Sequence, residues 1–172
     1  MSGRAYVVGF GNTARGDDGV GPLVVRRLRA SGLSSSRVRF LVREELSDDL
    51  LDCLEEASLI IFVDSSVGKS SEDVHWKKIQ ASRFPSSFTH AMTPQTFLWL
   101  LHLVKGKRPE AWLVAIPGEE FESDGVISPK AMSMALKAEV EIKQFLKRWT
   151  RKDKAFDQCH FDGEIASLLT NG

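Results

Sequence analysis

A segment rich in glycine and aspartate, residues 9–21, directly follows the first apolar run of the chain and reads GFGNTARGDDGVG. Its glycines indicate unusual backbone angles or the close approach of another group. The carboxylates of Asp17 and Asp18 would repel a pyrophosphate in a ligand crevice, but they suit a metal or a cationic partner. As an alternative, we expect one of the two aspartates simply to cap the helix that follows.

The first part of this segment, Gly9 to Ala14, also fits the glycine pattern of a dinucleotide-binding loop. Glu44 or Glu45, at the end of the next apolar run, could then hold a ribose. Such a loop needs a helix to begin almost at once, so that its amides face the phosphates, whereas the helical pattern here begins only near Val20. A nucleotide-binding module is therefore kept as an alternative to a metal site.

Two more residues have settings that suit chemistry. Asp64 follows the apolar run 59–63, so its carboxylate is expected to emerge beside the glycine and aspartate segment. It could instead merely accept hydrogen bonds from Ser65, Ser66 or loop amides. His90 lies in a loop of small residues that leads into a predicted helix, although an ordinary hydrogen-bonded loop histidine would fit there too.

Together, Asp18, Asp64 and His90 could place two carboxylates and one imidazole around a metal and leave coordination positions open for a reaction. These ligand types suit zinc, manganese, iron, cobalt and nickel almost equally, so their spacing does not choose the metal. The other histidines are interpreted as ordinary residues of a strand surface, a helix and the chain end: His75, His102 and His160.

These residues need a scaffold, and the apolar runs predict one. We expect strands at residues 5–9, 38–42, 59–63, 74–79 and 111–116. The first and third runs are apolar throughout, which is typical of central parallel strands. The run 111–116 is also expected inside the sheet, whereas 38–42 should lie nearer an edge and 74–79 at an edge.

Between the strands the apolar period changes to about 3.6 residues, which is typical of helices. Thr93-Pro94 and Ser128-Pro129 both have the form of a cap followed by a first-turn proline. Alternating strands and helices predict a three-layer α/β domain over residues 1–150, with its ligand crevice at the carboxyl ends of the strands. The last helix should end at about Trp149 or Thr150, which leaves residues 151–172 as a loosely held tail.

The bulk composition excludes some functions. With 23 basic and 23 acidic residues the net charge is zero, so charge gives no reason to expect nucleic acid or an anionic membrane as partner. The cysteines, Cys53 and Cys159, are too far apart in sequence to suggest a metal clip. Because no run has the length of a membrane span or the flanks of a secretion signal, we expect a cytoplasmic protein.

The motifs together resemble those of the hydrogenase maturation proteases, and the match runs in order from about Tyr6 to Leu146. The resemblance is carried by four stretches of sequence, namely Gly9-x-Gly11-Asn12-x(4)-Asp17-Asp18-Gly19-x-Gly21, Phe62-Val63-Asp64, Thr89-His90-Ala91-x-x-Pro94 and Ala115-Ile116-Pro117-Gly118-Glu119.

The resemblance implies a mixed five-stranded sheet between helices, and it implies that Asp18, Asp64 and His90 contact the nickel of a substrate. That substrate would be a hydrogenase large-subunit precursor, already loaded with nickel, whose C-terminal extension is removed by one cut. The nickel cofactor is thus expected to arrive with the substrate. A self-contained metal-dependent hydrolase using the same three residues is the alternative enzyme, and the oligomeric state is left open.

Overall fold

Five strands form one sheet in the order β2-β1-β3-β5-β4. The computed structural model describes residues 3–33, 35–67, 73–83, 92–122 and 124–170, and within 152–170 it describes the backbone alone. Strand β4 runs antiparallel to β5 and the other pairs are parallel, so the predicted mixed, mostly parallel sheet is confirmed. The strands are β1 (Arg4–Phe10), β2 (Val38–Arg43), β3 (Ala57–Val67), β4 (His75–Ile79) and β5 (Glu110–Gly118).

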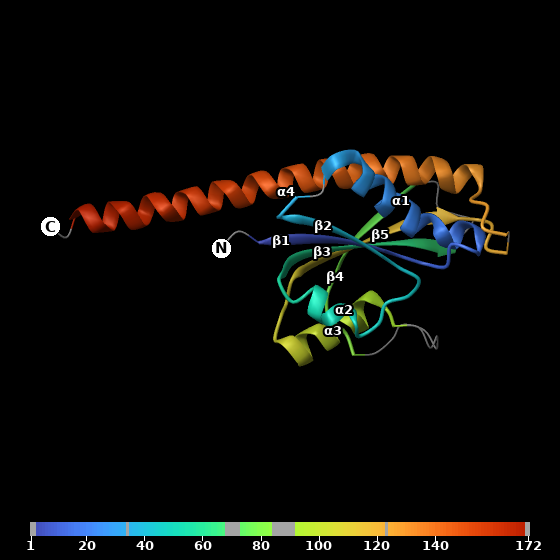
Figure 1. Cartoon of the computed structure of the whole chain (residues 1–172), viewed down its shortest axis with the longest axis horizontal. Coiled ribbons are helices and arrows are strands. Elements are labelled where there is room, and N and C mark those ends of the chain that lie inside the picture. Colours follow the sequence, from blue (N-terminus) through green and yellow to red (C-terminus); the bar gives the residue numbers. More distant parts are fainter. Residues whose placement is uncertain (1–2, 34, 68–72, 84–91, 123, 171–172) are drawn as a thin grey trace.

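Helices cover both faces of this sheet (Figure 1). Helices α1 (Val20–Leu28) and α4 (Pro129–Thr170) pack against one face, and α2 (Leu50–Cys53) and α3 (Pro94–Lys105) pack against the other. Two short helical segments, η1 (Gly16–Gly19) and η2 (Arg29–Leu33), flank α1. The three-layer arrangement predicted from sequence is confirmed. Among the described residues, no helix is both long enough and apolar enough to cross a membrane.

Strand β3 anchors the centre of the sheet because its side chains are buried on both faces. Leu59, Ile61 and Val63 pack beneath α1 and α4. Ile60 and Phe62 pack against α2 and α3 instead. Burial of each such side chain stabilises the fold by roughly 1.5–3 kcal/mol. Together these side chains can offset the free-energy cost of placing a half-buried carboxylate at position 64.

Both proline-started helices begin as predicted. The Thr93 hydroxyl accepts a hydrogen bond from the Thr96 amide at 3.2 Å, and the Ser128 hydroxyl accepts one from the Ala131 amide at 3.2 Å. The predicted end of the last helix is wrong, however, because α4 continues through Thr170 and extends past the sheet in Figure 1. A boundary at residue 150 between the domain and a loosely held tail stays a prediction.

Candidate functional site

The turn after β1 packs tightly against the ends of the central strands, and two glycines permit this. Gly11 has a φ of +139°, and a Cβ atom there would lie 2.0 Å from the carbonyl oxygen of Asp18. A Cβ atom on Gly21 would lie 2.4 Å from the carbonyl oxygen of Val63. Only glycine therefore lets η1 and the start of α1 approach the carboxyl edge of the sheet this closely.

Asp18 lies in η1 and turns its carboxylate toward the end of β3. Its Oδ2 accepts a hydrogen bond from the Asn12 amide at 2.9 Å, and its Oδ1 accepts one from the Ser65 hydroxyl at 3.3 Å. Asn12 is itself oriented by the Ala14 amide, which donates to its side-chain oxygen at 2.8 Å. The predicted convergence of the first loop and the third strand is thus present in the fold.

Asp64 is half-buried beside this loop. It lies just past the end of the β1–β3 pairing, which stops at Gly9 and Val63. Our expectation that Asp64 ends its strand is wrong, because β3 continues to Val67 by pairing with β5. The carboxylate therefore lies where β3 no longer pairs with β1, although β3 itself continues for three more residues alongside β5.

The environment of Asp64 opposes its ionisation. Burial raises its pKa to about 7, helped by the negative charge of Asp18, while a hydrogen bond from the Ser65 amide acts in the opposite direction. This amide bond agrees with the alternative suggested by the sequence, but one neutral donor does not balance the cost of burying the charge. A cation placed near both carboxylates would remove that cost.

Asp18 and Asp64 line one pocket of about 310 Å³ at the carboxyl edge of the sheet. A larger cavity of about 700 Å³ lies between β4, α3 and the segment before β5, but it contains neither carboxylate. The smaller pocket is the better candidate site, because it combines converging charges with a perturbed pKa at the crevice of an α/β sheet. The pocket is completed by Arg15, Ser65, Val67 and Phe121.

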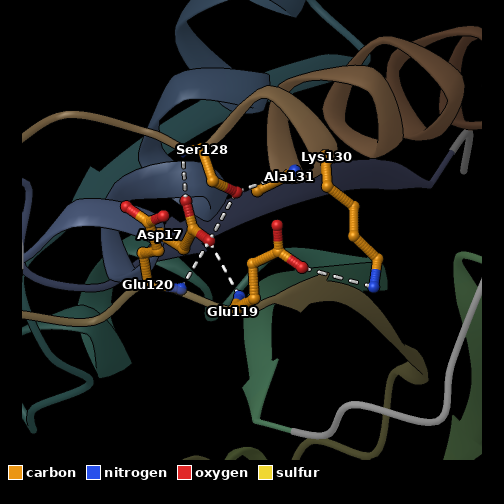
Figure 2. A network of polar contacts seen from close by, with 6 residues as sticks. All are labelled: Asp17, Glu119, Glu120, Ser128, Lys130 and Ala131. Carbon is orange, nitrogen blue, oxygen red and sulfur yellow. Dashed lines mark hydrogen bonds and ion pairs between the residues drawn. The ribbon is translucent and has the colours of Figure 1, made fainter.

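The neighbouring Asp17 has a structural role that the sequence did not predict. Its carboxylate is fully buried and accepts four hydrogen bonds, which tie η1 to the end of β5 and the start of α4 (Figure 2). The donors are the amides of Glu119 at 2.8 Å, Glu120 at 3.0 Å and Ser128 at 2.6 Å, and the Ser128 hydroxyl at 2.8 Å.

The hydrogen bonds decide the charge state of Asp17. Burial acts to raise its pKa, but the donors outweigh burial and hold the pKa below its usual value. The prediction that Asp17 or Asp18 caps the following helix is wrong, because η1 intervenes and Gly19 is the residue before α1. The Asp17 carboxylate instead lies at the start of α4, more than a hundred residues away in sequence.

The two described carboxylates fit a metal with open coordination positions, but they do not form a closed site. Among the described residues, no group of three or more histidine, cysteine, aspartate or glutamate side chains could hold a metal ion. His90, the predicted third ligand, lies outside the described residues. His75 pairs with Ala115, which also pairs with Asp64 on its other side, so His75 lies two strands away.

The geometry disfavours a dinucleotide-binding loop at Gly9 to Ala14. After this stretch the chain forms η1, and α1 begins only at Val20. Asp18 lies within η1, and its carboxylate already accepts a hydrogen bond from the Asn12 amide. An amide of the turn is therefore used on an internal anion, whereas a phosphate-binding loop leaves its amides free for the ligand.

The chain is similar in structure to several solved hydrogenase maturation proteases. No protein-family model matches it, and no curated protein matches its sequence significantly. A [NiFe] hydrogenase maturation protease, HycI from Thermococcus kodakarensis, is 20% identical with a TM-score of 0.69, over 84% of this chain and 92% of that one. The hydrogenase maturating endopeptidase HybD from Escherichia coli is 21% identical with a TM-score of 0.68, over 84% and 93%.

A hydrogenase 2 maturation peptidase from a Thaumarchaeota archaeon is 20% identical with a TM-score of 0.60, over 83% of this chain and 97% of that one. At these identities the likeness shows the fold. The chain therefore has the α/β fold of these maturation proteases over nearly their full length.

Proposed function

We infer that this protein is an endopeptidase that removes the C-terminal extension of a hydrogenase large-subunit precursor. The observation that carries the proposal is the convergence of Asp18 and Asp64 in one pocket, at the carboxyl edge of a sheet with the fold of maturation proteases. The motif resemblance between Tyr6 and Leu146 supports the same function independently of the structure. It also implies a cytoplasmic reaction, which cell fractionation would test.

In this proposal the nickel belongs to the substrate. The Asp18 and Asp64 carboxylates would bind a nickel ion that the precursor presents, and His90 would be the third protein ligand. The pKa of Asp64 is raised to about 7, which means that its ionised form is unfavourable in this pocket. A nearby cation would stabilise that ionised form. Nickel binding would therefore favour the ionised form of Asp64. Recognition of the loaded precursor would be coupled to loss of the Asp64 proton.

Bound nickel could polarise a nearby peptide carbonyl or activate a water molecule. The role of Asp18 and Asp64 is to hold the metal, and with it the adjoining peptide, at the carboxyl edge of the sheet. A hydrolase that recognises its substrate in this way needs no nucleophilic side chain of its own. This agrees with a sequence that contains no HExxH motif and no evident serine or cysteine triad.

The proposal is tested with two isosteric variants, Asp18→Asn and Asp64→Asn. Each removes one negative charge from the pocket, so cleavage of nickel-loaded precursor should fall by about 100-fold or more while the fold is kept. Loss of the extension can be followed by mass spectrometry, and the fold by circular dichroism.

Asp48→Asn is the matched control, because Asp48 is exposed and lies away from the pocket. This variant should cleave at the wild-type rate. Wild-type turnover by folded Asp18→Asn or Asp64→Asn would overturn the assignment of the site.

A further inference from the structure

Arg15 stands at the rim of the pocket, immediately before η1. Its amide donates to the Asn12 carbonyl at 3.1 Å, and its carbonyl accepts from the Asp18 amide at 3.1 Å. A backbone bridge also pairs Arg15 with Asp124. The backbone of Arg15 is therefore fixed on both sides, while its long exposed side chain can reach into the pocket.

The charge of Arg15 has no partner among the described side chains. Within the part of the chain that the structure describes, its guanidinium forms no hydrogen bond or ion pair, although Asp18 and Asp64 line the same pocket. Nor is Arg15 among the groups that shift the pKa of Asp64, which are the Ser65 amide and the Asp18 charge. The cation is thus available to a ligand that enters the pocket.

The chemistry of that ligand follows from the guanidinium and its surroundings. Five N–H donors in a rigid fork match the two oxygens of a carboxylate. The other side chains at the rim include Val67, which is 86% exposed, and Phe121, so a polypeptide that covers them would partly exclude water and strengthen the ion pair. An exposed, unpaired side chain is poorly preorganised, which argues against a role in stabilising charge in the transition state.

The geometry points to Arg15 as a residue that binds a carboxylate of the precursor polypeptide, while Asp18 and Asp64 bind its nickel. This inference rests on the proposed function and names a second recognition element in the same site. The substrate would then present a positive metal and a negative carboxylate close together. The carboxylate is either an acidic side chain near the scissile bond or the α-carboxylate at the end of the extension.

The test is steady-state cleavage of nickel-loaded precursor by the wild type, Arg15→Gln and Arg15→Lys. Arg29→Gln is the matched control, because it removes an equal charge from an exposed position at the end of α1. For Arg15→Gln we expect KM to rise about tenfold, with kcat within about twofold of the wild type. Arg15→Lys should recover part of this loss, and the effect should shrink between about 0.05 M and about 0.5 M salt.

Two altered precursors identify the source of the carboxylate. One has the acidic side chains near the scissile bond replaced by their amides, and the other has a few neutral residues added after its C-terminus. The precursor that lacks the relevant carboxylate should be cut equally well by the wild type and Arg15→Gln.

Equal KM values for Arg15→Gln and Arg29→Gln would overturn the inference and leave the proposed function standing. A loss confined to kcat would also overturn it, because the side chain would then act in the chemical step. No cleavage of loaded precursor by the wild type would overturn the proposed function and this inference together.

Discussion

Asp17 and Asp64 lie at the same edge of the sheet, but their surroundings are opposite. Asp17 is fully buried and accepts four hydrogen bonds, and its pKa is lowered. Asp64 is half-buried and lies near the charge of Asp18, and among the described residues the Ser65 amide alone favours its ionised form, so its pKa is raised to about 7. Burial alone therefore does not decide whether a carboxylate is ionised. The hydrogen-bond donors and the charges around it also shift its pKa.

The difference separates a structural carboxylate from one suited to a ligand. The hydrogen bonds of Asp17 hold η1 against β5 and α4, which fixes the position of the adjoining Asp18. Asp64 is held where its charge is costly, and a carboxylate of this kind in a cleft is a candidate for function. The two roles predict that the same change, aspartate to asparagine, has opposite effects on the free energy of unfolding at the two positions.

The largest effect on stability is expected at Asp17. Asp17→Asn removes the negative charge that four donors share and turns an amide group toward them, so the free energy of unfolding should fall by about 3 kcal/mol. For a domain of this size the melting temperature should drop by about 6–12 °C. Thermal unfolding at pH 7 measures this. An unchanged melting temperature would show that the network contributes little.

A smaller effect of opposite sign is expected at Asp64 in the metal-free protein. Its pKa is raised from 3.8 to about 7 by folding, so the stability associated with the neutral acid is present below pH 4 and is lost as pH rises through 7. The full shift corresponds to at most about 4 kcal/mol, and partial solvent exposure reduces the expected effect to about 2 kcal/mol.

Asp64→Asn should therefore stabilise the metal-free protein at pH 8 and leave its stability at pH 4 nearly unchanged. Denaturant unfolding at the two pH values measures the difference. Equal stability of the wild type and Asp64→Asn at pH 8 would show that the carboxylate is not strained. Asp17→Asn should have the opposite effect and destabilise the protein at pH 8. The lowered pKa of Asp17 adds stability above about pH 4, and this stability is lost as pH falls.

The smallest effect is expected from Ser128→Ala, which sharpens the account of Asp17. The Ser128 hydroxyl donates to Asp17 at 2.8 Å and accepts the Ala131 amide at 3.2 Å, so its loss removes one of four donors and the cap of α4. We expect a cost of about 1 kcal/mol in the free energy of unfolding, measured by denaturant titration. If Ser128→Ala lowered the free energy of unfolding as much as Asp17→Asn does, the Ser128 cap rather than the Asp17 carboxylate would be the main source of stability at this edge.

The sequence predicted the parts of this edge that depend on local patterns. The apolar run 59–63 identified a central strand, and the rule that ligands bind beyond parallel strand ends placed Asp18 and Asp64 near one another. The role of Asp17 could not be predicted, because its donors come from Glu119, Glu120 and Ser128, and no local pattern pairs residues so distant in sequence.

Two boundaries were also missed. Strand β3 continues past Asp64 because β5 still pairs with it, and strand pairing is not encoded in the run itself. Helix α4 continues past Thr150, where the apolar period that marked its earlier turns is lost. The contribution of His90 to the site stays a prediction, because His90 lies outside the described residues.

The most direct test of the central claim is to compare nickel-free and nickel-loaded large-subunit precursor as substrates of the wild-type protein. Metal in the purified protein is measured beforehand by mass spectrometry, and loss of the C-terminal extension is followed over time. We predict that the protein holds little metal and cuts only the loaded precursor, because in the proposed mechanism the substrate's nickel completes the site formed by Asp18 and Asp64. Efficient cutting of nickel-free precursor by a zinc-containing protein would contradict this account and favour a self-contained metal hydrolase.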